Sequence, residues 1–235
     1  MKRRDLECER VTEGSGRLRY YPLYLNIVNK RCTVVGGGEV AARKVERLLR
    51  CGARVTVIGR ELSPALDALK KNGRVEHIES DYRKEHLEGA FLVIGATDNP
   101  EVNERIYWDS REKGVLVNIV DDPGLCDFIL PSLMERGDLS IAVSTGGKSP
   151  ALARKIRQEL ERIYGPEYEV LIRIMGVLRE RVLYRRGPSE ANRQVFEAVL
   201  DSDVLDEIRK KDWKAVKERV RDLTGEEIDD FEVEE

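Results

Sequence analysis

Three consecutive glycines between an apolar run and a helix-forming run most constrain how this chain can fold. Residues 33–44 read Thr-Val-Val-Gly-Gly-Gly-Glu-Val-Ala-Ala-Arg-Lys. In this order Gly36 can make the tight turn after a strand, Gly38 lets a ligand approach the backbone, and Ala41 keeps a helix close to the sheet. Free N–H groups at the helix start favour a bound phosphate. The pattern predicts a dinucleotide-binding turn, and a purely structural turn remains the alternative.

The flanking sequence alternates between strand and helix signals. The expected strands are 31–35, 55–58, 75–78, 91–96 and 115–120, and helical spacing or helix-start signals mark 39–51, 63–71, 84–89 and 101–113. Such alternation predicts an α/β fold with a parallel, doubly wound sheet. Ligands bind beyond the carboxyl ends of the strands in such sheets, where Gly36, Gly59, Thr97 and Asp121 fall.

The pattern changes after Asp122. We expect two strands at 127–130 and 139–144 around a turn at 136–138, a helix over 150–164, and charged helices over 167–185, 189–200, 202–210 and 212–223. Two strands with so little sheet of their own suggest pairing with a second chain. The expected organisation is a mobile tail (1–19), a dinucleotide-binding domain (20–122), a dimerisation and substrate segment (123–165), a helical domain (166–225) and a solvated acidic tail (226–235).

Charge and hydropathy exclude some classes of partner. Lys and Arg total 41 against 44 Asp and Glu, giving a net charge of −3. No general basic field therefore attracts nucleic acid. No apolar run approaches the ~18 to 20 residues that span a bilayer, and residues 1–10 lack the apolar core of a signal peptide. We expect a cytoplasmic protein with no membrane partner.

Cysteines and histidines offer no catalytic or metal-binding cluster. The four cysteines, at positions 8, 32, 51 and 126, are scattered and form no C-x-x-C pair, so no metal site is expected. Cys32 and Cys51 are expected to be small buried hydrophobic residues. His77 and His86 lie in polar sequence and are expected on the surface, which argues against a histidine-based mechanism.

The end of the second expected strand carries both signs of charge. Glu61 lies near the position where an acidic residue binds the ribose hydroxyls of NAD, whereas Arg60 could meet the 2′-phosphate of NADP. The spacing favours NAD over NADP. Arg60 and Glu61 can also be read as a solvated turn with no ligand.

Two adjacent carboxylates end the fifth expected strand, in the sequence Asn-Ile-Val-Asp-Asp-Pro at 118–123. Adjacent residues of an extended chain point in opposite directions, so only one carboxylate can face a ligand. Asp121 follows the strand directly and is the candidate general base. Asp122 precedes a proline and can cap a turn. A turn-forming Asp pair without catalytic function is an equal alternative from this stretch alone.

The loop Thr-Gly-Gly-Lys-Ser-Pro at 145–150 contains Gly-Lys-Ser but not a full phosphate-loop motif, because Ala142 stands where the first glycine is required. It still offers N–H groups, a hydroxyl and Lys148 at a helix start, followed by Arg154. Such a loop can hold an anion, and an ordinary basic helix start is as compatible with the charge pattern.

Taken together, five segments resemble the siroheme-synthase family, in its precorrin-2 dehydrogenase and sirohydrochlorin ferrochelatase module. They are Val-Val-Gly-Gly-Gly-Glu-Val-Ala-Ala-Arg-Lys (34–44), Gly-Ala-Thr-Asp (95–98), Asn-Ile-Val-Asp-Asp-Pro (118–123), Phe-Ile-Leu-Pro-Ser (128–132) and Ala-Val-Ser-Thr-Gly-Gly-Lys-Ser-Pro (142–150). The resemblance covers about residues 20–165. It implies a Rossmann-type domain that binds NAD, a tetrapyrrole substrate and a homodimer.

The resemblance also implies an activity and a set of site residues. The activity is NAD-dependent oxidation of precorrin-2 to sirohydrochlorin in siroheme biosynthesis, and relatives differ in whether they then insert Fe²⁺. The essential aspartate of the family maps to Asp121. The expected cofactor contacts are Gly36, Gly37, Gly38, Glu39, Val40, Ala41, Arg60, Glu61, Thr97, Asp98 and Asn118, and the expected substrate contacts are Ser144, Thr145, Lys148 and Arg154. The alternatives are an NAD-dependent dehydrogenase of another small substrate and a non-catalytic NAD-sensing module.

Overall fold

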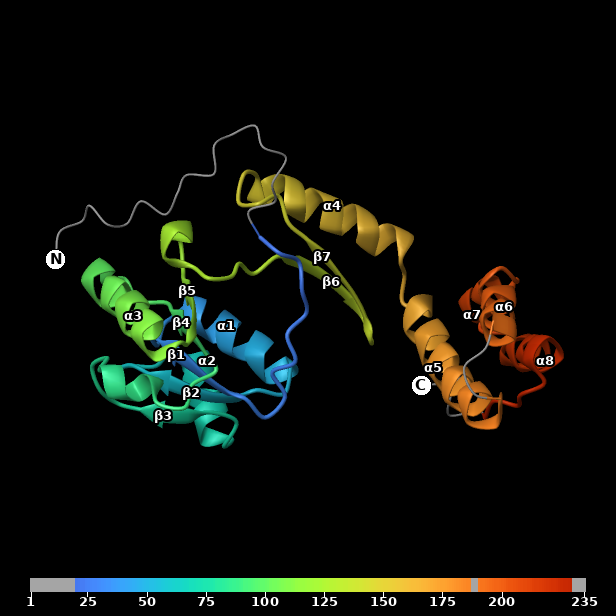
Figure 1. Ribbon diagram of the computed structural model, residues 1–235, viewed down its shortest axis with the longest axis horizontal. Coiled ribbons are helices and arrows are strands. Elements are labelled where there is room, and N and C mark those ends of the chain that lie inside the picture. Colours follow the sequence, from blue (N-terminus) through green and yellow to red (C-terminus); the bar gives the residue numbers. More distant parts are fainter. Residues whose placement is uncertain (1–19, 187–189, 230–235) are drawn as a thin grey trace. The chain divides into compact units, whose positions relative to one another are not determined.

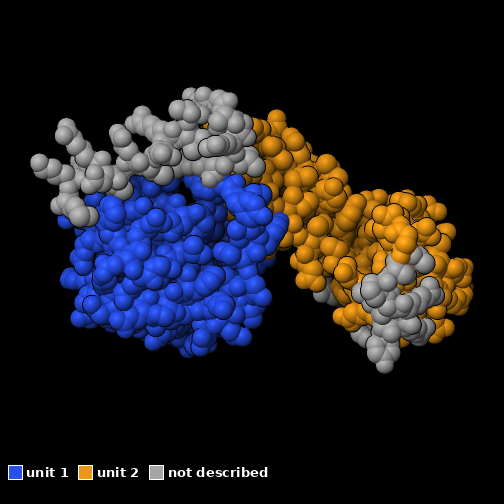
Figure 2. Space-filling model, viewed as in Figure 1, with its two compact units in different colours: residues 1–130 blue, residues 131–235 orange. Residues whose placement is uncertain are grey.

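The computed structural model describes residues 20–186 and 190–229. The chain divides into two compact units, residues 1–130 and residues 131–235 (Figure 2). The expected tail at residues 1–19 lies outside the described residues, as do residues 230–235. Among the described residues, no helix combines the length and the apolar character needed to cross a membrane.

The first unit is built on a five-stranded parallel sheet, which confirms the predicted α/β fold. Its strands are β1 (Arg31–Val35), β2 (Arg54–Ile58), β3 (Glu76–Ile78), β4 (Leu92–Gly95) and β5 (Leu116–Ile119), in the spatial order β3-β2-β1-β4-β5 (Figure 1). The chain order reverses between β1 and β4. In open α/β sheets, ligands bind at this switch point, beyond the carboxyl ends of the strands.

Alternating side chains of the strands form two hydrophobic cores, one on each face of the sheet. Val34 and Val57 pack with α1 (Glu39–Arg50) and α2 (Pro64–Lys71). Val93 and Val117 pack on the other face with α3 (Pro100–Lys113) and the 3₁₀ turn η2 (Lys84–Leu87). Complete burial of each such side chain contributes about 1.5–3 kcal/mol. Burial on both faces explains why the central strands are rich in apolar and β-branched residues.

The second unit combines a two-stranded antiparallel sheet with five helices in the described part of the chain. The strands β6 (Ser132–Arg136) and β7 (Leu139–Val143) turn at Gly137, whose φ of +52° favours glycine. The helices are α4 (Pro150–Ile163), α5 (Glu167–Arg186), α6 (Glu190–Leu200), α7 (Val204–Arg209) and α8 (Trp213–Thr224). Helices α5 to α8 share an apolar core that includes Ile174, Leu178 and Val216.

One predicted strand is wrong. Residues 127–130 form no strand, and the strand that pairs with β7 begins at Ser132. Asp127 instead binds β5 with both its backbone and its side chain: its N–H donates to Val117 O (2.8 Å) and its carboxylate accepts from Val117 N (3.2 Å). A side-chain carboxylate, and not a backbone carbonyl, accepts the hydrogen bond from Val117 N. The segment therefore runs beside β5 without adding a strand to the sheet.

Three expectations about exposure are also corrected. Cys32 is buried as predicted, but Cys51 ends α1 and is exposed. His86 is buried rather than on the surface, because η2 packs against α3. The predicted acidic tail is not solvated where it is described, since Ile228 is part of the helical core.

Candidate functional site

The three glycines of the turn between β1 and α1 have different surroundings. At Gly36, whose φ is +120°, a Cβ atom would lie 2.2 Å from the backbone oxygen of Ala96, and at Gly37 it would lie 1.8 Å from that of Glu61. At Gly38 a Cβ atom would meet nothing within 4 Å. The first two glycines are therefore required by packing against the ends of β4 and β2. The third faces open space that a ligand can enter.

Helix α1 begins without a side-chain cap. Its N-cap residue is Gly38, and no side chain accepts a hydrogen bond from its first turn. In contrast, Ser63 caps α2, Asn99 caps α3 and Ser149 caps α4. The first N–H groups of a helix carry a partial positive charge and need an acceptor. The open start of α1 is thus suited to a phosphate group.

The end of β2 is closed by an ion pair that the sequence did not reveal. The guanidinium of Arg60 contacts the carboxylate of Asp81 at 2.5 Å, and both side chains are largely exposed. The hydrogen bond with Asp81 raises the pKa of Arg60, and the same bond lowers the pKa of Asp81. The backbone of Glu61 packs against Gly37. Asp81 follows β3 as Arg60 follows β2. Its position after a strand is the sequence feature from which a role at this end of the sheet could have been predicted.

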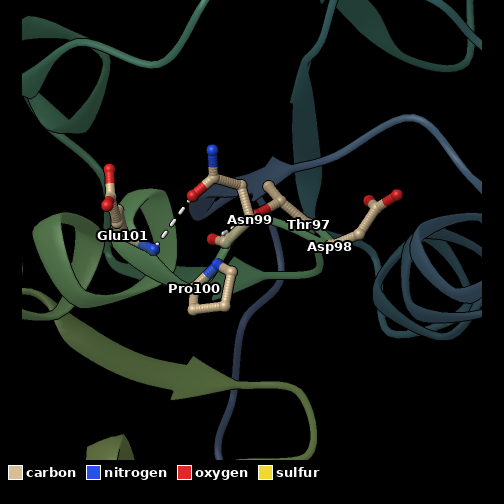
Figure 3. Close-up of a pocket in the computed structure, with 5 residues that line it drawn as sticks. All are labelled: Thr97, Asp98, Asn99, Pro100 and Glu101. Atoms are coloured by element: carbon tan, nitrogen blue, oxygen red, sulfur yellow. Dashed lines mark hydrogen bonds between the residues drawn. The ribbon is translucent and has the colours of Figure 1, made fainter.

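The end of β4 forms an open hollow of about 820 Å³ lined by Thr97, Asp98, Asn99, Pro100 and Glu101 (Figure 3). Thr97 is held in place by Asn103: its hydroxyl donates to Asn103 Oδ1 and its carbonyl accepts from Asn103 Nδ2, both at 2.8 Å. In Figure 3 the Asp98 carboxylate points away from Asn99 and Glu101. Asp98 is therefore directed away from the capped start of α3.

The two aspartates after β5 have separate surroundings. Asp121 is exposed and has a φ of +63°, in the left-handed region that few residues other than glycine adopt. Asp122 caps the 3₁₀ turn η3 (Pro123–Leu125), because its Oδ1 accepts from Gly124 N at 3.0 Å. Burial lowers the pKa of Lys44 on α1, while the charge of Asp121 raises it. This opposing effect indicates that Asp121 lies near the side of α1.

The buried Asn118 has a structural contact. Its amide donates to the carbonyl of Phe128 at 2.9 Å and so holds the segment after η3 against β5. This hydrogen bond fixes the chain that follows Asp121, because Phe128 lies after Asp121 in the sequence.

In the second unit, the loop before α4 is held by hydrogen bonds between its own hydroxyl oxygens and its own backbone N–H groups. Ser144 accepts from Gly146 N and Thr145 accepts from Ser149 N, each at 3.1 Å. Both oxygens remain able to donate to a ligand. Lys148 and Arg154 are exposed near this loop. These four residues belong to this loop and the helix that follows it. Most of the predicted cofactor residues instead lie near the carboxyl ends of the strands in the first unit, whereas Asn118 is buried within β5.

No group of three or more His, Cys, Asp or Glu side chains within residues 20–186 and 190–229 is arranged to hold a metal ion.

Comparison with known proteins identifies two matching families. Residues 23–132 match a family described as putative NAD(P)-binding, and residues 136–163 match one described as sirohaem biosynthesis protein central. The first match contains the whole parallel sheet. The second contains β7 and α4 and begins at the last residue of β6.

Curated relatives carry the name siroheme synthase. The chain is 38% identical over 203 residues to siroheme synthase 1 of Aeromonas salmonicida, covering 86% of this chain and 43% of the relative. It is 41% identical over 187 residues to the siroheme synthase of Nitrosospira multiformis, covering 78% of this chain and 40% of the relative. The chain thus spans less than half the length of these relatives.

A solved structure shows the same fold. The structure of a protein named SirC, precorrin-2 dehydrogenase superimposes with a TM-score of 0.73 at 23% identity, covering 88% of this chain and 100% of that one. The agreement extends beyond the parallel sheet into the second unit, because it covers more of the chain than residues 1–130.

Proposed function

We propose that this chain, which belongs to the siroheme-synthase family, oxidises precorrin-2 to sirohydrochlorin with NAD as the hydride acceptor. The observation that carries the proposal is the open, uncapped glycine turn at the switch point of the sheet. Like the exposed Asp121, this turn lies beyond the carboxyl ends of the parallel strands. The shared name of the relatives and the name of the structurally similar protein agree with it.

The residues of the turn fit a dinucleotide. The N–H groups of Glu39 and Val40 lie in the uncapped first turn, and Gly38 leaves room for a pyrophosphate beside them. Ala41 is completely buried and keeps α1 against the sheet. Glu61 would accept from the ribose hydroxyls. Bound here, NAD⁺ supplies the hydride acceptor that the oxidation needs.

Asp121 would act as the general base. Oxidation of precorrin-2 removes a hydride and a proton, and a carboxylate oxygen of Asp121 accepts that proton in this proposal. Asp122 is the less suitable of the two carboxylates, because it accepts from Gly124 N as the cap of η3. The left-handed turn at Asp121 ends β5 and directs the two carboxylates differently.

The loop before α4 would bind the substrate. Precorrin-2 carries eight carboxylates, which need cationic and hydroxyl partners. Lys148 and Arg154 supply positive charge, while Ser144 and Thr145 supply O–H donors on a loop with fixed shape.

Insertion of Fe²⁺ into sirohydrochlorin is part of the proposal as a second activity. Here Fe²⁺ is a substrate, and the step requires removal of pyrrole N–H protons. Asp121 would accept these protons as well, so a single substitution should remove both activities.

We also propose a homodimer formed through the second unit. Met134 is the one buried residue of β6 and β7, so most of this two-stranded sheet stays partly accessible although α4 packs against it. On α4, Leu152 and Ile163 remain 48% and 59% exposed. Light scattering should give twice the 26.9 kDa of one chain. A mass of one chain at micromolar concentration would contradict the dimer.

The decisive assay follows NADH formation when the protein is incubated with NAD⁺ and precorrin-2, with and without Fe²⁺. Asp121→Asn should lower kcat at least about 100-fold, whereas Asp122→Asn should keep most of the activity. Equal losses in both variants would reject Asp121 as the base. NAD⁺ binding without turnover would favour a sensing module. Turnover of a small hydroxy acid, but not of precorrin-2, would favour another dehydrogenase.

A further inference from the structure

We propose that Asp81 makes this site select NAD over NADP, by holding the one guanidinium that the loop after β2 offers to a 2′-phosphate. The inference rests on the proposed function, because it assumes that the glycine turn binds a dinucleotide. It assigns a specificity role to a residue that follows β3 and lies outside the glycine motif.

The geometry brings Arg60 and Asp81 together from neighbouring strands. Arg60 is the second residue after β2 and Asp81 the third after β3, and these strands pair in parallel. The guanidinium and the carboxylate are 2.5 Å apart. The backbone just before Arg60 is fixed as well, because His77 Nε2 contacts the carbonyl of Gly59 at 2.8 Å. The pair therefore stands where the second strand of such a sheet meets the adenosine ribose.

The charges favour the cofactor without the extra phosphate. A 2′-phosphate would need the positive charge and the donors of Arg60, and Asp81 already offsets that charge and accepts from Nη2 of the guanidinium. It would also bring negative charge close to the Asp81 carboxylate and to Glu61. The free ribose hydroxyls of NAD instead can donate to such carboxylates. Loss of the Asp81 charge should release Arg60 and remove the repulsion together.

The expected effect is moderate because the pair is exposed. The side chains of Arg60 and Asp81 are 75% and 70% accessible, so water and salt screen their interactions. We expect the ratio Kd(NADP⁺)/Kd(NAD⁺) to fall about fivefold to tenfold in Asp81→Asn at low salt. The change should shrink as salt is added.

Calorimetric titration of the full chain with NAD⁺ and with NADP⁺ tests the proposal. The variants are Asp81→Asn, Arg60→Ala and the double substitution. In the double substitution the fall in the ratio should be smaller than in Asp81→Asn, because the repulsion is lost but no guanidinium remains to bind the 2′-phosphate. Asp67→Asn is the matched control: Asp67 is an exposed carboxylate paired with Lys71 on α2, so its loss removes the same charge without releasing Arg60. The control should leave the ratio unchanged.

The outcomes separate this inference from the proposed function. An unchanged ratio in Asp81→Asn, with NAD⁺ still bound, overturns the role of Asp81 and leaves the proposed function standing. An equal fall in Asp67→Asn overturns it too, because general charge would then explain the effect. Wild-type protein that binds neither dinucleotide overturns both proposals.

Discussion

Helices α1 and α3 both begin at the carboxyl edge of the sheet, after the neighbouring strands β1 and β4, yet their first turns differ. At α3, Asn99 accepts from the N–H groups of Glu101 (2.9 Å) and Val102 (3.2 Å), and Pro100 occupies the first turn. At α1, Gly38 offers no side-chain acceptor. The first turn of α3 is thus completed by its own sequence, whereas the first N–H groups of α1 stay available to water or to a ligand.

The difference has an energetic meaning. A side-chain cap typically stabilises a protein by about 1 kcal/mol relative to alanine at the same position, and by about a few tenths of a kcal/mol relative to glycine. The chain forgoes this contribution at α1, although Gly38 has the extended backbone of a normal N-cap, with φ −82° and ψ −176°. Sites that bind ligands often lack stabilising interactions that a ligand later supplies. The contrast between the two helix starts therefore supports a ligand at α1 and a structural role for the start of α3.

The largest expected effect tests the packing that shapes the α1 turn. Gly37→Ala places a Cβ atom 1.8 Å from the backbone oxygen of Glu61, so the loop after β2 must move. We expect a loss of about 3 kcal/mol or more in the free energy of unfolding, measured with urea. Gly38→Ala is the control, since its Cβ meets nothing within 4 Å. Similar stability of both variants would contradict this packing.

The next effect gives α1 the cap that α3 already has. In Gly38→Asp the new carboxylate can accept from the first turn, and we expect about a few tenths of a kcal/mol of added stability, because glycine is itself a tolerated N-cap residue. The same group occupies the phosphate donors and repels the pyrophosphate, so the Kd for NAD⁺ should rise about 10-fold to 100-fold. Unfolding and calorimetric titration measure the two changes. Unchanged NAD⁺ affinity would show that the dinucleotide does not bind this helix start.

A smaller effect concerns the capped helix. Asn99→Ala removes both side-chain contacts at the start of α3 and should cost about 1 kcal/mol of unfolding free energy. We expect the Kd for NAD⁺ to stay within about twofold, because α3 is completed without a ligand. A large loss of NAD⁺ affinity at normal stability would make the two helix starts functionally alike.

The smallest effect concerns the start of the 3₁₀ turn η2, where the titratable side chain of His86 accepts a backbone hydrogen bond. In η2, His86 Nδ1 accepts from Arg83 N at 3.1 Å, and burial lowers the pKa of His86 from its ordinary value of 6.5. The unfolded chain therefore takes up this proton at higher pH than the folded chain. The contribution of neutral His86 to the free energy of unfolding is present above pH 6.5, and it is lost as the pH falls through the lower pKa of His86 in the folded chain.

Urea unfolding between pH 7 and pH 5 tests this expectation. The decline in unfolding free energy should be shallower in His86→Gln than in wild type, with His77→Gln as the control. Identical slopes in wild type and His86→Gln would show that His86 does not contribute.

Much of the fold follows from local sequence. The strands of the parallel sheet were predicted within one residue at each end, because runs such as Val-Thr-Val-Ile at 55–58 are apolar or β-branched and glycine or polar residues bound them. Asp127 shows where local pattern failed, because its carboxylate satisfies Val117 N, a contact ten residues distant that hydropathy does not reveal. Ile228 was assigned to a tail because its neighbours are acidic, although it packs in the helical core.

The candidate site shows the same division. The sequence predicts Asp121 and the glycine turn as parts of the site, since both come at the ends of expected strands, and these remain predictions. It did not reveal that Asp81 holds Arg60, because 21 residues separate the two and only the pairing of β2 with β3 brings their ends together.

By itself, the sequence determined that a glycine turn joins the first strand to the first helix, since spacing and backbone freedom are local properties. Only the tertiary structure decided the separate functions of the three glycines. Gly36 meets Ala96 and Gly37 meets Glu61, which are distant in sequence, while Gly38 meets nothing. Packing between distant segments is what closes the first two positions and leaves the third open to a ligand.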